Sequence, residues 1–302
     1  MRQLLIVIAL VFAHTAMAGD FEDGIAAFDR KDYATAFTKF RSAAQQGNPV
    51  AQYNLGFMYD HGEGVAQDYT EAVRWYLLAA HQGVADAQYN LGNMYRHGRG
   101  VAQDYEEAVR WYQLAAQQGL AQAQYNLAIQ YDFGRGVKQD YKEAVRWFQL
   151  AAQQGLAQAQ YNLGVMYKDG QGVAQDYKEA VRWFQLAAQQ GVAQAQYNLG
   201  IMYRNGQGVA QDYKQAMRWY RLAALQGNAK AQNNLGFMYG NGFGVVQDYV
   251  RAHMWYNIAA VNGDKMSVEN RDIVASKMTP QQVEQAQRMA RECMASNFKK
   301  CD

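Results

Sequence analysis

The stretch GVAQDYKEAVRWFQLAAQQG, residues 172–191, gathers side chains that could do chemistry. Asp176 and Glu179 could form a carboxylate pair for acid–base catalysis, and Arg182 beside Trp183 could hold an anion. Almost the same letters recur along the chain at intervals of 36 residues. A catalytic centre needs one copy of its residues, whereas an architecture needs them in every copy. The recurrence favours a structural role, and no catalytic residue is predicted.

Tryptophan marks the repeat most clearly. All six tryptophans, from Trp75 to Trp255, stand 36 residues apart, and tyrosine and aspartate recur at the same interval. A fixed period of this size is typical of stacked arrays, in which each unit buries its apolar faces against its neighbours. The sequence therefore predicts six full repeats over residues 49–264.

Each repeat contains two amphipathic segments. In the fourth repeat, Ala159 and Leu163 share one helical face, and Trp183 and Ala187 belong to a second apolar stripe. The glycines of residues 169–173 can adopt left-handed conformations, which end a helix and turn the chain. A pair of helices joined by a glycine-containing loop is predicted for every repeat.

Short polar residues set the expected helix starts. Asp176 is well placed to cap the second helix of the fourth repeat, with Glu179 three positions on to complete a capping box. Glu179 also stands where it can pair with Arg182. In the sixth repeat both members of this pair change together, to Arg251 and Met254, as a paired role requires.

Both ends of the array depart from the repeat. Residues 19–48 keep a second-helix pattern but lack the Gly-x-Gly loop, which predicts a shortened capping repeat. Residues 265–302 predict degenerate capping helices, with Thr279, Pro280 and Gln282 marking the start of the last one. Polar terminal units of this kind shield the ends of a stack.

The first 18 residues have the composition of a secretory signal peptide. Arg2 precedes an apolar run over residues 4–13, and Ala-Met-Ala ends at Ala18. The run is too short to span a bilayer, and the alternative of a buried N-terminal helix is disfavoured because the run has no polar face. Cleavage after Ala18 predicts an exported chain with no membrane span.

The charge of the chain bears on the class of partner, and its cysteines bear on the cellular compartment. The net charge is +2, from 29 basic and 27 acidic residues, which gives no reason to expect nucleic acid. Cys293 and Cys301 are the only cysteines, and an oxidising compartment predicts a disulfide between them. A redox-active pair is the alternative, but the Cys-x-x-Cys spacing is missing.

The stretch AQAQYNLGVMYKDGQGVAQDYKEAVRWFQLAAQQG, residues 157–191, resembles the Sel-one-like repeat, a longer relative of the tetratricopeptide repeat. The likeness covers residues 20 to about 264 and weakens towards Cys293. It implies an all-α, right-handed α/α solenoid of about seven helix pairs with a C-terminal capping region. It also implies an adaptor that binds a protein or peptide and needs no cofactor. Together with the signal peptide, it favours the bacterial periplasm, with secretion as the second choice.

Positions that differ between the repeats suggest where a partner binds. They lie three residues apart on the first helix, on one face with a recurring tyrosine, and in tetratricopeptide relatives that face lines a concave groove. We expect a peptide along the tyrosines and alternating charges, with asparagines holding its backbone. The alternative is that these positions are merely tolerant of change. The predicted groove residues are Tyr53, Asn54, Phe57, Asp60, Tyr89, Asn90, Asn93, Arg96, Tyr125, Asn126, Ile129, Asp132, Tyr161, Asn162, Val165, Lys168, Tyr197, Asn198, Ile201, Arg204, Asn234 and Phe237.

Hydrolase and metal chemistry have weaker support. A cysteine-rich branch of the family is associated with β-lactam hydrolysis, but it carries cysteine pairs inside its repeats, and here the repeats contain none. One Ser-x-x-Lys match, Ser296 to Lys299, lacks the companion motifs of such enzymes. His61 and His97 have no carboxylate partners at ligand spacing, so solvated loop histidines are expected and no metal is predicted. A hydrolase acting on β-lactams or peptidoglycan remains the alternative function.

Overall fold

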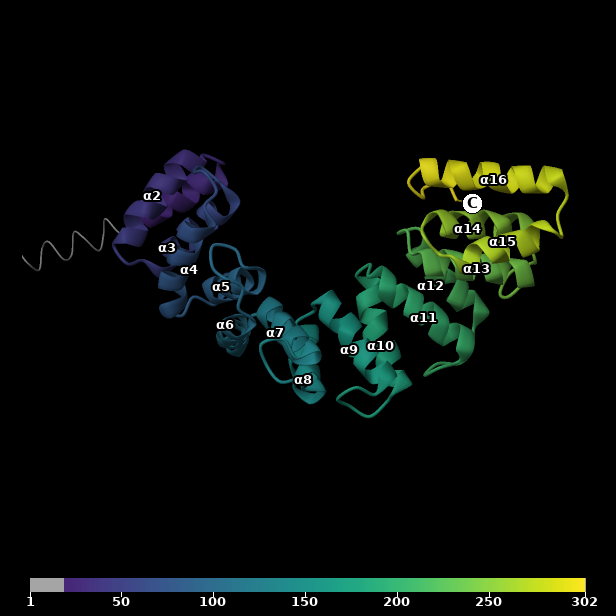
Figure 1. Ribbon diagram of the computed structural model, residues 1–302, viewed down its shortest axis with the longest axis horizontal. Coiled ribbons are helices and arrows are strands. Elements are labelled where there is room, and N and C mark those ends of the chain that lie inside the picture. The colour runs from purple at the N-terminus through teal and green to yellow at the C-terminus, as the bar shows by residue number, and fades with distance from the viewer. Residues whose placement is uncertain (1–18, 302) are drawn as a thin grey trace, which may run out of the picture. The chain divides into compact units, whose positions relative to one another are not determined.

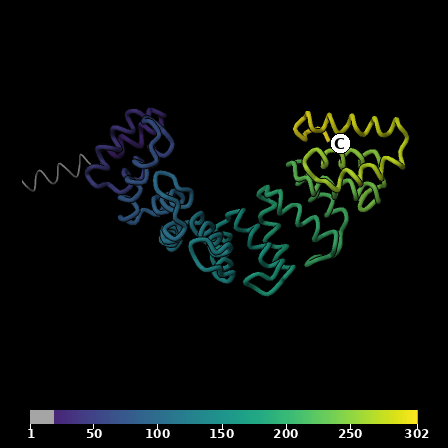
Figure 2. Tube along the Cα trace, in the orientation of Figure 1, coloured from purple at the N-terminus to yellow at the C-terminus, as the bar shows by residue number. Residues whose placement is uncertain are grey.

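The computed structural model describes residues 19–301, and the predicted signal peptide, residues 1–18, lies outside them. Within this range every regular element is an α-helix, and the helices alternate with short loops along the chain trace (Figures 1 and 2). The prediction of an all-α array of helix pairs is confirmed. None of the helices in the described range is both long enough and apolar enough to cross a membrane.

The chain divides into two compact units, Met1–Ala151 and Ala152–Asp302. In the first unit, residues 19–29 are helical and pack beside α2. Helix α8 (Tyr141–Gln153) runs across the division. The other helices of the first unit are α2 (Tyr33–Gln45), α3 (Pro49–His61), α4 (Tyr69–His81), α5 (Ala85–His97), α6 (Tyr105–Gln117) and α7 (Ala121–Phe133).

The second unit continues the same alternation and ends with two helices outside the repeat pattern. These are α15 (Met266–Ala275) and α16 (Pro280–Ala295), and both pack against α14. The repeat helices of this unit are α9 (Ala157–Asp169), α10 (Tyr177–Gln189), α11 (Ala193–Asn205), α12 (Tyr213–Ala224), α13 (Ala229–Asn241) and α14 (Tyr249–Val261).

The predicted helix caps are present, with one correction. Asp176 accepts hydrogen bonds from the backbone N–H groups of Lys178 and Glu179, at 2.8 and 3.1 Å, as an N-cap should. The capping box expected at Glu179 is wrong, because the backbone N–H of Asp176 already donates to the carbonyl of Tyr167 at 2.9 Å. The carboxylate of Glu179 accepts from Arg182 at 3.3 Å, which confirms the predicted pair.

Two glycines in the connecting loop have different reasons to be glycine. Gly170 ends α9 with φ +70°, a left-handed conformation that side chains disfavour. Gly208, the second glycine of the next loop, lies against the preceding repeat, where a Cβ would stand 2.2 Å from the carbonyl oxygen of Tyr177. The Gly-x-Gly pattern therefore combines a helix end with a close contact between successive repeats.

Buried glutamines connect each repeat to its neighbour. Gln160 is buried in α9, and its amide nitrogen donates to the carbonyl of Ala152 at 3.1 Å. Its amide oxygen accepts from Gln190, which follows the next helix, at 2.9 Å. Because both ends of the amide are paired, its burial carries no unsatisfied polar group. Gln52, Gln88, Gln196 and Gln232 accept the equivalent bond from Gln82, Gln118, Gln226 and Asn262.

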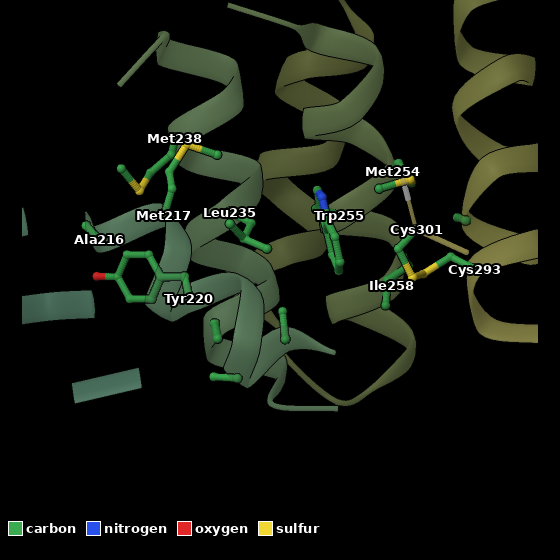
Figure 3. Close-up of a cluster of buried hydrophobic side chains, with 14 residues drawn as sticks. Ala216, Met217, Tyr220, Leu235, Met238, Met254, Trp255, Ile258, Cys293 and Cys301 are labelled. Carbon is green, nitrogen blue, oxygen red and sulfur yellow. A yellow bond between two sulfur atoms is a disulfide. The ribbon is translucent and has the colours of Figure 1, made fainter. Parts of the chain in front are cut away.

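The C-terminal end of the second unit is covered by the last helix and a disulfide. Figure 3 shows the bond between Cys293 and Cys301 beside Ile258, whose side chain is fully buried in the same apolar cluster. The residue at the same repeat position is 37% exposed at Leu186 and 39% exposed at Leu222. Helix α16 and the tail therefore bury an apolar position that the preceding repeats expose.

Candidate partner-binding site

The predicted groove tyrosines rest on aromatic rings of the following helix. Tyr89 packs on Tyr112 with ring centroids 6.1 Å apart, and Tyr161 packs on Phe184 at 5.9 Å. Gly164 makes room for this contact, because a Cβ there would lie 2.7 Å from Cδ1 of Phe184. These tyrosines are half-buried, so each ring forms part of the core and part of the surface. The same pairing joins Tyr53 to Tyr76, Tyr125 to Phe148 and Tyr197 to Tyr220.

The first unit has a polar cavity of about 420 Å³ on this face. It is lined by the side of α5 that carries the predicted residues, together with residues of α3 and α7. Its position shows that α3, α5 and α7 bring predicted residues of three successive repeats together. The predicted residues in its lining are Asp60, Tyr89, Asn90, Asn93, Arg96 and Asn126, and the others are His61, Met94, His97 and Arg99.

The asparagines of this cavity form hydrogen bonds with one another and with buried tyrosines. The Tyr112 hydroxyl donates to Oδ1 of Asn93 at 2.7 Å, and Nδ2 of Asn126 donates to the same oxygen at 3.2 Å. Nδ2 of Asn90 donates to the Tyr76 hydroxyl at 3.2 Å. Asn126 is only 8% exposed. Asn90 and Asn126 therefore each donate a hydrogen bond to the protein's own framework, and their predicted role in holding a ligand backbone stays a prediction.

Charge in the first cavity is mixed. Burial, followed by the nearby Asp60 carboxylate, raises the pKa of Tyr76, and its hydroxyl donates to Oδ2 of Asp60 at 3.3 Å. Burial and the cations of Arg96 and Arg99 lower the pKa of His97, so its imidazole is neutral at pH 7. Two guanidinium groups and one carboxylate thus surround a neutral imidazole, a lining suited to a polar, hydrogen-bonding ligand.

The two histidines are placed differently from the prediction. His61 and His97 are the last residues of α3 and α5 rather than loop residues, although both are exposed. The His61 ring stacks on Phe57 with centroids 4.0 Å apart, and its Nδ1 lies 3.0 Å from the Phe57 carbonyl. Across residues 19–301 no group of three or more His, Cys, Asp or Glu side chains is arranged to hold a metal ion.

The second unit has a larger cavity, of about 600 Å³, lined by α9, α11 and the start of α13. Its floor is more apolar than that of the first cavity, because Val165 and Ile201 stand where Asn93 stands in the first unit. Burial raises the pKa of Tyr161 and of Tyr197, so both hydroxyls remain protonated hydrogen-bond donors. The predicted residues in its lining are Tyr161, Val165, Lys168, Tyr197, Asn198 and Ile201.

Four further residues line this cavity that the sequence reasoning missed: Gln194, Asn228, Ala229 and Lys230. They belong to the starts of the first helices, a part of the repeat that the sequence reasoning left aside. A signal was present, because the position of Lys230 is Asp86 in the second repeat and glutamine in the three between. With Lys168 it places two ammonium groups at the edge of an apolar floor.

The remaining predicted residues are spread out. Arg204 and Phe237 line a third cavity, of about 530 Å³, beside a stacked pair of rings, Tyr213 and Phe243, whose centroids are 4.9 Å apart. The cations Arg96, Lys168 and Arg204 therefore lie in three different cavities. The predicted residues that line none of these three cavities are Tyr53, Asn54, Phe57, Tyr125, Ile129, Asp132, Asn162 and Asn234.

Ser296, the serine of the Ser-x-x-Lys match, lies at the end of α16. Its hydroxyl donates to the carbonyl of Cys293 at 2.8 Å and accepts from the backbone N–H of Lys300 at 2.9 Å. Both bonds hold the C-terminal turn next to the disulfide. The hydroxyl thus serves the local backbone, as is usual for serine at a helix end.

Comparison with known proteins agrees with this architecture. The Sel1 repeat model matches six consecutive segments, residues 49–84, 85–120, 121–156, 157–192, 193–228 and 229–264. The chain belongs to the Sel1 repeat family. Sel1 repeats form solenoids of helix pairs that generally mediate protein–protein interactions, and Sel1 scaffold proteins are in general not enzymes.

Solved structures of Sel1 repeat proteins are similar to this chain. One from Oxalobacter formigenes is 35% identical, with a TM-score of 0.69, over 80% of this chain and 96% of that chain. A protective antigen of uropathogenic Escherichia coli with the SLR fold is 29% identical, with a TM-score of 0.40, over 93% and 85% of the two chains. No curated protein matches the sequence.

Proposed function

We propose that this Sel1 repeat protein is an exported scaffold of a bacterial cell envelope. It binds segments of partner proteins in the cavities that lie along the first helices of its repeats. The observation that carries the proposal is the 600 Å³ cavity of the second unit, which is large enough for several side chains of a peptide. Aromatic residues such as these tyrosines are enriched at protein–protein interfaces, and well-packed pockets at the centre of an interface carry much of the binding energy.

Export rests on the first 18 residues of the sequence and on the disulfide. An apolar run after Arg2, followed by Ala-Met-Ala, is the pattern that signal peptidases accept. A disulfide between Cys293 and Cys301 requires an oxidising compartment to persist. A bacterial periplasm satisfies both requirements, and secretion to the outside is the second choice.

Selection from a random peptide library against residues 19–302 tests the binding role. Peptides retained by the wild type are labelled, and their dissociation constants are measured by fluorescence anisotropy. Replacing Arg96, Lys168 and Arg204 together by Glu should weaken the retained peptides about tenfold or more without changing the helix content. The matched control replaces three exposed cations of second helices, Arg74, Arg110 and Arg182, by Glu.

Two results would contradict the proposal. If both triple variants weaken binding equally, general charge rather than the cavities holds the peptide. If no peptide is retained above background while a chromogenic β-lactam is hydrolysed, the hydrolase alternative gains support. Export is tested separately: an alkaline phosphatase fusion after residue 18 should be active in Escherichia coli, and an inactive fusion would refute it.

A further inference from the structure

A fourth cavity lies between α12, α13 and α14. It measures about 320 Å³ and shares no lining residue with the other three cavities. Its floor is formed by Met217 of α12, Leu235 of α13 and Trp255 of α14, which appear together in Figure 3. Leu235 and Trp255 are 1% and 2% exposed, so the floor is part of the core rather than a mobile surface.

Three cations of α12 stand around this apolar floor. Lys214, Arg218 and Arg221 follow one another at intervals of four and three residues, which places them on one side of the helix over two turns. The other wall comes from Tyr239, Gly244 and Val245. The only titratable group in that wall is the phenol of Tyr239, so no carboxylate lines the cavity among the described residues.

The cluster is peculiar to the fifth repeat. In the first four repeats a glutamate stands one turn before the arginine and pairs with it, for example Glu179 with Arg182 at 3.3 Å. In the fifth repeat Gln215 replaces this glutamate, and Arg221 replaces a leucine or glutamine. Positions 214, 215, 218 and 221 therefore carry a charge of +3, whereas the equivalent positions of the other full repeats carry between −1 and +1.

We propose that this cavity is a second peptide-binding site, which takes an acidic segment that inserts one bulky apolar side chain between its carboxylates. The floor of Met217, Leu235 and Trp255 buries the apolar side chain, and a cavity of 320 Å³ holds one such group. Arg218 and Lys214 bind carboxylates on either side, because charge-assisted hydrogen bonds to guanidinium and ammonium groups are the stronger kind.

The other charges near the site do not oppose this assignment. Arg251 of α14 lies over the Tyr239 ring, 5.9 Å from its centroid, and its Nη1 is 3.0 Å from Oδ2 of Asp248. That ion pair neutralises the carboxylate of Asp248, the residue that caps α14. Arg218 lies over the Trp219 ring, 5.8 Å from its centroid, and also lines the cavity.

The test uses three labelled peptides: Asp-Glu-Phe-Glu-Asp, its amide analogue Asn-Gln-Phe-Gln-Asn, and Asp-Glu-Ser-Glu-Asp. We expect the first peptide to bind at least tenfold more tightly than either of the others, measured by fluorescence anisotropy at 150 mM salt. The double variant K214E/R218E should weaken the first peptide at least tenfold. The matched control is K178E/R182E at the same positions of α10, which should change binding less than twofold.

Several outcomes would overturn the assignment. Equal binding of the acidic peptide and its amide analogue would show that the cations are not used. Equal loss in the two double variants would show that only net charge matters. Tighter binding to vesicles of phosphatidylglycerol than to the acidic peptide would assign the surface to a membrane. Because K214E/R218E alters only exposed side chains, unchanged helix content and melting temperature separate these outcomes from unfolding.

Discussion

The polar cavity of the first unit and the 600 Å³ cavity of the second unit share four positions of the Sel1 repeat, those of Tyr89, Asn90, Asn93 and Arg96, and differ in what lines them. In the first unit, Asn93 joins Tyr112 and Asn126 in a hydrogen-bonded network. In the second unit, Ile201 holds the place equivalent to Asn93 and lines an apolar floor. The packing beneath both cavities is the same, a tyrosine on an aromatic ring. The packing framework is therefore common to the two units, whereas the residues that line the cavities differ.

The largest expected effect comes from removing the shared framework. Phe184 is fully buried beneath Tyr161, so Phe184→Ala should lower the free energy of unfolding by about 3–5 kcal/mol. The control is Gln189→Ala on the exposed side of the same helix. Urea unfolding followed by circular dichroism measures both, and a loss below about 1 kcal/mol for Phe184→Ala would show that the ring is not part of the framework.

Substitution by methionine at two buried glutamines should change the free energy of unfolding in opposite directions. Gln130 is fully buried and neither atom of its amide has a hydrogen-bond partner, whereas Gln160 is paired at both ends. Methionine stands at the position of Gln130 in the other full repeats, for example Met166.

Gln130→Met should therefore raise the free energy of unfolding by about 1–3 kcal/mol, since an unsatisfied amide leaves the core. Gln160→Met should lower it by a similar amount, because it leaves the amide of Gln190 and the carbonyl of Ala152 without this partner. Calorimetric melting of both variants decides the point. Shifts of the same sign would show that side-chain volume, rather than hydrogen bonding, governs these positions.

Exchanging residues that line the cavities should show in which unit these residues contribute to the stability of the fold. Asn93→Ile removes the acceptor of two hydrogen bonds in the first unit and should cost about 1–3 kcal/mol. Ile201→Asn, in the half-buried lining of the second unit, should cost less than about 1 kcal/mol. Urea denaturation compares the two, and a larger loss for Ile201→Asn would reverse the distinction between the cavities.

The smallest effect is a pH dependence that differs between the units. Burial, followed by the nearby Arg271 cation, lowers the pKa of His253, with Asp272 acting in the opposite direction. The unfolded chain then binds a proton near pH 6.5 that the folded chain does not, so stability should fall as the pH drops below 6.5.

For one such histidine, the free energy of unfolding can change by at most about 1.4 kcal/mol per pH unit. His253→Phe should remove it, and His97→Gln should remove a smaller part, because His97 is exposed at the edge of its cavity whereas His253 is 2% exposed. Melting temperatures between pH 5 and pH 8 measure the difference. A larger change for His97→Gln would mean that the cavity, rather than the core, controls the response to acid.

Local features of the chain were predictable. The period of 36 residues, the helix pairs, the cap at Asp176, the capping box at Thr279 and the pairing of Glu179 with Arg182 all depend on residues a few positions apart. Their geometry is set by the helix itself, so spacing alone is enough to predict them.

Features that join neighbouring repeats were decided by the tertiary structure. The sequence shows asparagine at position 126, but only the approach of α7 to α5 puts its amide on Asn93. Gly208 looks like a turn residue, but its contact with Tyr177 depends on how one repeat stacks on the next. The cavities themselves arise from side chains 30 or more positions apart, whose distances no local pattern contains. The sequence by itself determined the repeat and its helices, and the packing of one repeat on another determined which of its polar residues line the cavities.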